Sequence, residues 1–196
     1  MSRGRGGAAL VTGAVALLLA LAGCTGDTAS AGSAPDAATA HTVLHPCPAQ
    51  PDQAARGATT LAHLTFGCVG GGTLDLGRAP GVPMVVNLWG SWCDPCREEL
   101  PIMQQLADAA GDRVRVVGVI SKDGVPQAES FAEDAGITFP SAFDGQGDLM
   151  ARQGLNALPV SYLVDAQGGV TWTQVGPVAS LDELEQLVAA HLGVQL

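Results

Sequence analysis

The chain has 196 residues, and 47% of them are apolar while only 14% are charged. This length and composition fit one packed domain with extensions and exclude a chain that is disordered throughout. Nineteen acidic residues against nine basic ones give a formal net charge of −10. Because no basic run offsets this charge, it argues against nucleic acid as a partner.

The first 23 residues have the three zones of a secretory signal peptide. Arg3 and Arg5 precede an apolar run that ends in small residues. The run holds about fifteen apolar residues, fewer than the ~20 that a membrane-spanning helix needs. Its end, LAGC at residues 21–24, resembles the lipobox of bacterial lipoproteins, which implies cleavage before Cys24 and lipid on that residue. We expect 1–23 to be a lipoprotein signal peptide that leaves the protein extracytoplasmic, anchored to the outer face of the membrane. The alternative is an uncleaved anchor.

Residues 24–45 are predicted to form a flexible tether, because most of them are Ala, Ser, Gly, Thr, Asp or Pro without an apolar period. The packed domain is expected over residues 46–196. His41 and His45 have a spacing that could share a metal ion on a helix. Pro46 and the tether composition argue against a helix there, so we expect no metal site.

Five cysteines are an odd number, but lipidation of Cys24 would leave four. Four cysteines in an oxidising compartment suggest two disulfides. If Cys93 pairs with its near neighbour Cys96, only Cys47 and Cys68 remain to pair with each other. We expect that second bridge to be structural. The alternative is a second redox pair that relays electrons to the first.

Two segments before the middle of the chain are predicted to be extended. Short strand-like runs within 61–68 and 73–76, separated by three glycines, predict a small hairpin beside the main sheet. Residues 84–89 are continuously apolar apart from Asn87, as is typical of a strand covered on both faces. We expect the buried amide of Asn87 to find local hydrogen-bond partners.

Residues 92–96, with the sequence WCDPC, follow this strand directly and precede a helix-like segment. A thiol at such a junction lies near the helix N-terminus, where unpaired N–H groups and the helix dipole favour the thiolate. Two cysteines at this spacing can close a disulfide and pass on two electrons, without an added cofactor. A zinc site would need a second ligand pair, which the sequence lacks. We therefore prefer a redox-active dithiol to a zinc site or a chance pair.

The segment 86–101, VNLWGSWCDPCREELP, resembles the active-site segment of the TlpA/ResA family of thioredoxin-fold thiol-disulfide oxidoreductases. The likeness extends from about Thr73 to the C-terminus. It implies that Cys93 is the exposed attacking thiol and Cys96 the buried resolving one. It also implies that Glu99 handles protons near the dithiol, while the alternative for Glu99 is a solvated helix carboxylate.

Thioredoxin itself carries a buried Asp in the strand before its motif, and this chain has Asn87 there. The difference removes one candidate proton acceptor and makes Glu99 more important. In thioredoxin-fold proteins a cis-proline also lies against the dithiol. Pro159 matches that element, and the alternative is a trans proline that starts a strand. Trp92 and Leu158 are expected to line the groove that contacts a partner.

Beyond the motif, strand-like and helix-like segments alternate, which favours a layered α/β domain. The expected strands and helices up to Pro159 are 113–120, 125–135, 137–143 and 147–153. This stretch resembles the central insert that distinguishes the TlpA/ResA family from thioredoxin. A strand hairpin over 160–175 and a helix from a capping box at 180–183 complete the chain. We expect a thioredoxin-like fold: a central mixed sheet flanked by helices, with the insert and an N-terminal β-hairpin.

The expected activity is disulfide exchange with partner proteins, in which reduced Cys93 attacks and Cys96 resolves the mixed disulfide. Asp94 beside the attacking thiol disfavours its thiolate, whereas Arg97 and the helix dipole favour it. Pro95 completes the turn that tunes the pair. Together with the resemblance, Asp94 favours a reductase, for example of apocytochrome c or copper-site cysteines. An oxidase that introduces disulfides is the alternative.

Other classes of protein fit the sequence less well. A peroxiredoxin-type peroxidase would carry one peroxidatic cysteine without the WCDPC arrangement, and a metal-delivery lipoprotein would need His or Met beside the cysteines. An inert binding module would show no insulin reduction. The expected partners are protein thiols and disulfides, together with a membrane electron donor or acceptor. We expect the protein to be a monomer without a cofactor.

Overall fold

The computed structural model describes residues 42–196. The expected signal peptide, the lipidation residue Cys24 and nearly all of the expected tether lie outside this range. None of the helices in the described part of the chain combines the length and apolar character needed to cross a membrane.

Strands and helices alternate along most of the domain. In chain order they are β1 (Thr65–Gly67), β2 (Thr73–Asp75), β3 (Met84–Trp89), α1 (Asp94–Ala110), β4 (Arg115–Ser121), α2 (Val125–Ala135), β5 (Ser141–Asp144), α3 (Asp148–Arg152), β6 (Val160–Val164), β7 (Val170–Val175) and α4 (Leu181–Leu192).

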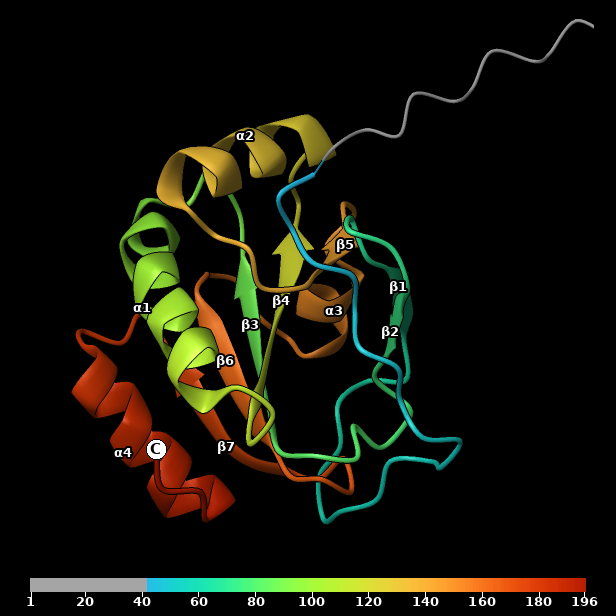
Figure 1. Cartoon of the computed structure of the whole chain (residues 1–196). Helices are drawn as coiled ribbons and strands as arrows, with labels where there is room; N and C mark the ends of the chain where they lie inside the picture. The colour runs from blue at the N-terminus through green and yellow to red at the C-terminus, as the bar shows by residue number, and fades with distance from the viewer. Residues whose placement is uncertain (1–41) are drawn as a thin grey trace, which may run out of the picture. The chain divides into compact units, whose positions relative to one another are not determined.

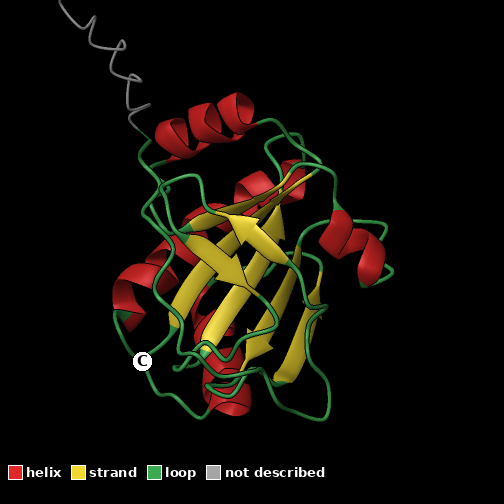
Figure 2. Cartoon of the chain, turned by 90° about the vertical axis from the view of Figure 1, so that its right-hand side faces the viewer, coloured by secondary structure: helices red, strands yellow, loops and turns green. Residues whose placement is uncertain are grey.

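The central sheet has five strands in the order β5-β4-β3-β6-β7. β3 is parallel to β4, and β4 is parallel to β5, whereas β6 runs antiparallel to both β3 and β7. Helices α1 and α4 lie together on one side of the sheet, and α3 lies on the other (Figure 1). Figure 2 shows the twist of the strands between these helices. The predicted mixed sheet flanked by helices is confirmed.

The predicted N-terminal hairpin is also confirmed. β1 and β2 pair antiparallel across the glycine-rich turn, where Gly71 and Gly72 have φ angles of 99° and 76°, which glycine adopts most readily. The hairpin is attached to the edge of β5, because Cys68 forms a β-bridge with Ala142 and the amide of Val69 donates to the carbonyl of Ser141 at 3.0 Å. The hairpin therefore extends one edge of the main sheet.

The packed domain includes residues just before position 46, where the sequence predicts the end of the tether. Leu44 is 2% exposed and belongs to the core, and the amide of His45 donates to the carbonyl of Thr138 at 2.8 Å. Two adjacent apolar residues, Val43 and Leu44, in a polar stretch produce no periodic pattern, so composition could not reveal which of them is buried.

The interior strands explain where the dithiol lies. All six residues of β3 are buried, as its near-continuous apolar sequence predicts. β3 and β4 are parallel neighbours, so the segments that follow their carboxyl ends meet at the same edge of the sheet. The WCDPC motif follows β3 at that edge, and the loop 122–124 follows β4.

Candidate active site

The motif is positioned by a tight turn between β3 and α1. Gly90 begins the turn, and a Cβ atom there would lie 2.5 Å from Nε1 of Trp92, so the turn needs glycine for the indole to pack on it. Cys93 is the N-cap of α1, and its Sγ accepts a hydrogen bond from the amide of Cys96 at 3.3 Å. Pro95 occupies the first turn, where a missing N–H costs the helix nothing. The attacking sulfur thus lies at the positive end of the helix dipole.

Cys93 and Cys96 form a disulfide with a Cα–Cα distance of 5.3 Å. Cys96 is fully buried, and Cys93 is 5% exposed. Cys93 is therefore less exposed in this disulfide-bonded state than the family resemblance implies, because its sulfur packs against the first turn of α1. It is still the cysteine of the pair that retains any access to solvent.

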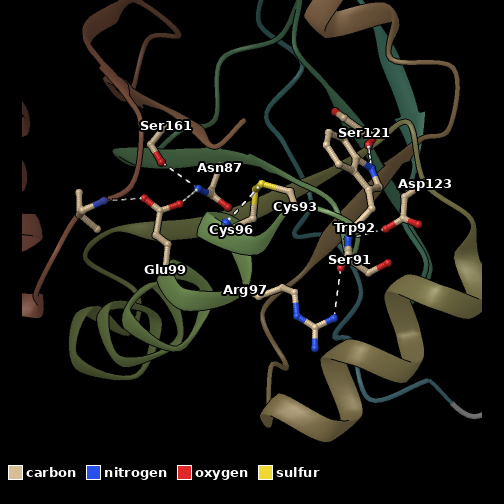
Figure 3. Close-up of a disulfide and its surroundings, with 11 residues drawn as sticks. Asn87, Ser91, Trp92, Cys93, Cys96, Arg97, Glu99, Ser121, Asp123 and Ser161 are labelled. Carbon is tan, nitrogen blue, oxygen red and sulfur yellow. Dashed lines mark hydrogen bonds between the residues drawn. A yellow bond between two sulfur atoms is a disulfide. The ribbon is translucent and has the colours of Figure 1, made fainter. Parts of the chain in front are cut away.

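Two residues at and just after the end of β4 hold the turn in place through hydrogen bonds. Nε1 of Trp92 donates to the carbonyl of Ser121 at 3.3 Å, and the amide of Ser91 donates to Oδ2 of Asp123 at 2.6 Å (Figure 3). Oδ1 of Asp123 accepts from the amide of Gly124 at 2.8 Å. Trp92 is nevertheless 53% exposed, so its indole is fixed in place while one face remains open to a partner.

The two charged residues beside the disulfide have different surroundings. Asp94 is exposed in the first turn of α1. The guanidinium of Arg97 lies 4.6 Å above the ring of Phe131, and its Nη1 donates to the carbonyl of Ser91 at 3.2 Å. Figure 3 shows the Arg97 side chain directed away from the disulfide. The Arg97 guanidinium is thus held by Phe131 and Ser91, and its stabilisation of a Cys93 thiolate stays a prediction.

Glu99 is only 1% exposed, which excludes a solvated helix carboxylate. Its Oε1 accepts from the amide of Val178 at 3.0 Å, and its Oε2 accepts from Nδ2 of Asn87 at 2.8 Å. Burial raises the pKa of Glu99 to about 7; these two hydrogen bonds oppose the rise, and the charge of Glu183 adds to it. The group can therefore gain or lose a proton near neutral pH.

Asn87 is fully buried at the centre of β3, and the hydrogen-bond partners expected for its amide are present for the nitrogen but not for the oxygen. Besides its bond to Glu99, Nδ2 donates to Oγ of Ser161 at 2.9 Å. Ser161 stands opposite Asn87 in the antiparallel pairing of β3 with β6. Oδ1 of Asn87 has no hydrogen-bond partner within the described residues.

The peptide bond between Leu158 and Pro159 is cis. Leu88 pairs with Val160 in the β3–β6 register, so Pro159 stands at the end of β3 from which the motif departs. Leu158 is 8% exposed, whereas Val175, on the neighbouring strand, is 70% exposed. Of the two residues expected to line a partner groove, Trp92 offers the larger exposed surface.

Cys47 and Cys68 form the second disulfide, with a Cα–Cα distance of 5.9 Å. The amide of Cys47 donates to the carbonyl of Gly71 at 2.9 Å, and that of Cys68 donates to the carbonyl of Gly72 at 3.0 Å. This bridge joins the N-terminal segment to the hairpin beside β5, whereas the dithiol follows β3. The two disulfides thus belong to different parts of the sheet.

Sequence reasoning missed four residues that contact the site, namely Ser121, Asp123, Ser161 and Val178. A signal for two of them was present, because Ser121 and Asp123 closely follow the strand expected over 113–120, and sites in α/β sheets lie outside the carboxyl ends of strands. No such signal marked Ser161 and Val178, which reach Asn87 and Glu99 from far along the chain. Over residues 42–196, no group of three or more His, Cys, Asp or Glu side chains is placed to hold a metal ion.

Comparison with known sequences finds a matching family and relatives that are thiol-disulfide oxidoreductases. The Redoxin family profile matches residues 31–188. Sporulation thiol-disulfide oxidoreductase A of Bacillus subtilis is 33% identical over 104 residues, which cover 51% of this chain and 63% of the relative. ResA of Geobacillus thermodenitrificans is 32% identical over 108 residues, covering 55% and 62%. A DsbE homolog of Paracoccus denitrificans is 34% identical over 127 residues, covering 61% and 68%. The chain thus spans slightly under two thirds of the first two relatives.

Solved structures agree with the sequence relatives. A secreted Mycobacterium tuberculosis disulfide oxidoreductase homologous to DsbE superposes with a TM-score of 0.57 at 28% identity, covering 65% of this chain and 96% of that one. StoA of Bacillus subtilis superposes with a TM-score of 0.53 at 27% identity, covering 64% and 96%. The chain therefore belongs to the Redoxin family, with the thioredoxin-like fold of the ResA, StoA and DsbE thiol-disulfide oxidoreductases.

Proposed function

We propose that this protein exchanges disulfides with partner proteins through Cys93 and Cys96, as an extracytoplasmic reductase. The observation that carries the proposal is the disulfide at the first turn of α1, in which Cys93 keeps slight exposure and Cys96 has none. Of the two residues, Cys93 is the one with surface open to a partner, and Cys96 is bonded to it from the buried side. The sequence relatives are named for the same class of chemistry, which supports the proposal.

The reaction proceeds by two thiol–disulfide exchanges. The thiolate of reduced Cys93 attacks one sulfur of the partner's disulfide, which forms a mixed disulfide and releases the other partner sulfur as a thiolate. Cys96, after losing its proton, attacks the sulfur of Cys93 and releases the second partner thiolate. Two electrons pass to the partner, and the Cys93–Cys96 disulfide is regenerated. A donor dithiol at the membrane then has to reduce it again.

The surroundings of Cys93 favour the reducing direction. A strong oxidant needs a stabilised thiolate in its reduced form, and the helix dipole supplies part of that stabilisation here. Asp94 adds a negative charge to the first turn of α1, directly after Cys93 in the chain, and the Arg97 guanidinium lies over the Phe131 ring. The negative charge of Asp94 lowers the stability of the Cys93 thiolate, and with it that of the reduced form, relative to a protein without this charge. The resemblance to the TlpA/ResA family adds disulfides in apocytochrome c or in copper-site proteins as candidate substrates.

Location follows from the N-terminal sequence and the cysteine chemistry together. The lipobox-like LAGC at residues 21–24 supports lipid attachment at Cys24 and a position outside the cytoplasm. Two disulfides suit an oxidising compartment. Labelling of cells with a fatty-acid analogue should mark the protein, and Cys24→Ala should abolish the label and release the protein from the membrane fraction. A labelled Cys24→Ala protein would contradict lipidation at that residue.

Trapping and potentiometry test the exchange and its direction. Cys96→Ala should accumulate mixed disulfides through Cys93, which mass spectrometry would identify, whereas a Cys93→Ala/Cys96→Ala control should accumulate none.

The direction of electron flow is tested by the reduction potential, which equilibration with glutathione or dithiothreitol gives. A value near about −270 mV supports a reductase, and one near about −120 mV would show an oxidase instead. Absence of both trapping and insulin reduction would refute disulfide exchange altogether.

A further inference from the structure

The unpaired oxygen of Asn87 lies in the interior of the site. Asn87 is fully buried, and both hydrogens of its Nδ2 are used, one on Oε2 of Glu99 at 2.8 Å and one on Oγ of Ser161 at 2.9 Å. Its Oδ1 has no donor within the described residues. A buried acceptor without a donor is unfavourable, so it calls for a reason in this fold.

The orientation of this amide is determined by its neighbours. When Glu99 is ionised it can only accept hydrogen bonds, so the nitrogen of Asn87 has to face it and the oxygen has to face the opposite way. Figure 3 shows the nitrogen turned toward Ser161 and Glu99, and the oxygen turned from them toward the side of the disulfide.

Cys96 lies where it can meet this oxygen. Cys96 and Glu99 are three residues apart on α1 and are both buried, so they face the sheet from consecutive turns with Cβ atoms roughly 5–6 Å apart. Asn87 reaches this face of α1 from β3 through its bond to Glu99. In the disulfide, Cys96 has no hydrogen to donate.

We propose that Oδ1 of Asn87 accepts a hydrogen bond from the Sγ–H of Cys96 in the reduced protein. The inference rests on the proposed function, because it concerns the reduced state that disulfide exchange produces. Reduction by an external dithiol breaks the S–S bond and adds two electrons and two protons to the pair. The buried Cys96 thiol then has a donor without access to water, and Asn87 has the unpaired acceptor. The amide is thus satisfied in the reduced state alone.

Two consequences follow for the dithiol. The hydrogen bond favours the reduced form, so Asn87 raises the reduction potential of the pair. It also holds Cys96 as a neutral thiol until the mixed disulfide has formed. Asn87→Ala removes the acceptor, and the equilibrium with dithiothreitol should shift at least about tenfold toward the disulfide, which corresponds to a potential lower by about 30 mV.

Infrared spectroscopy tests the bond directly. In full-length Cys93→Ser at about pH 8, where Glu99 is mostly ionised, the S–H stretching band of Cys96 should lie at the lowered frequency of a hydrogen-bonded thiol. Adding Asn87→Ala should move the band to the position of an unbonded thiol. A thiol at Cys24, where it is not lipidated, contributes equally to both proteins and cancels in the difference spectrum.

Ser161→Ala is the matched control, because it removes a partner of Nδ2 and leaves Oδ1 in place. Its S–H band should stay at the hydrogen-bonded position. A band at the unbonded position in Cys93→Ser alone would overturn the proposal, even if Asn87→Ala fails to fold. An unshifted band or an unshifted equilibrium in a folded Asn87→Ala protein would overturn it too. If insulin reduction still depends on Cys93 in that case, the proposed function stands.

Discussion

Asn87 and Glu99 are joined by a buried 2.8 Å hydrogen bond, in which the amide nitrogen of a central strand donates to the carboxylate of the helix that carries the dithiol. The bond connects the interior of the sheet to an acidic side chain near the disulfide, and burial raises the pKa of that side chain to about 7. Glu99 therefore holds a proton over part of the pH range in which the protein would work.

Glu99→Gln should slow disulfide exchange at neutral pH at least about tenfold, because it removes a group that can accept and return a proton near the dithiol. The pH–rate profile should also lose its inflection near pH 7. Stopped-flow tryptophan fluorescence across the neutral range measures both. Glu98→Gln, an exposed neighbour on the same helix, is the control and should leave the profile intact. Equal rates for Glu99→Gln and the unaltered protein at every pH would dispose of this role.

Stability should depend on pH through the same residue. The pKa of Glu99 rises from 4.5 to about 7 on folding, so the folded state binds the proton more tightly than the unfolded state. The free energy of unfolding should therefore fall as the pH rises through this window, by about 3 kcal/mol at most. Urea unfolding at both ends of the window, compared with Glu99→Gln, isolates the effect. A pH dependence that is identical in the two proteins would contradict it.

A variant without the Cys47–Cys68 disulfide distinguishes a structural role of this bridge from a redox role. Cys47→Ala/Cys68→Ala opens a loop with a sequence separation of 21 residues and should lower the free energy of unfolding by about 3 kcal/mol. Urea unfolding under oxidising conditions gives this value. Insulin reduction should continue at its original rate per folded molecule. A large loss of that rate, with the fold intact, would instead favour the relay of electrons from this pair to the dithiol.

Asp123 should matter for the geometry of the motif although it does not belong to it. Asp123→Ala removes the acceptor of the Ser91 amide, a charge-assisted bond that contributes about 1.5–3 kcal/mol. We expect a loss of stability of that order and exchange that is several-fold slower, measured by urea unfolding and stopped-flow kinetics. Asp134→Ala, an exposed acid of α2, should change neither quantity. Asp123→Asn keeps an acceptor oxygen and should recover most of the rate.

The charge of Asp94 should set part of the reduction potential. Asp94→Asn removes a negative charge beside Cys93, which stabilises the thiolate and with it the reduced form. The equilibrium with dithiothreitol should shift about tenfold toward the dithiol, so the potential should rise by about 30 mV. Asp112→Asn, which makes the same change just beyond the far end of α1, is the control. A potential that stays the same or falls would show that Asp94 does not act on the sulfur.

Much of the architecture could be predicted because its causes are local. The helix at 125–135 has the bounds that its sequence predicts, since Gly136 ends it in the left-handed conformation with a φ of 66°. Ser180 caps α4 as predicted, with its Oγ accepting from the amide of Glu183 at 3.2 Å. Leu44 was missed because its burial depends on how this segment packs on the rest of the domain, where its neighbour His45 donates to the carbonyl of the distant Thr138.

The sequence by itself determined the turn from strand to helix, the spacing of Cys93 and Cys96 and their place at the helix N-terminus, since each depends on residues within a few positions of one another. The tertiary structure alone decided what surrounds the dithiol. Asn87 meets Ser161 across 74 positions, and Glu99 meets Val178 across 79. Such contacts depend on strand register and helix packing, which the whole core sets together. The burial that moves the pKa of Glu99 toward neutrality has the same origin.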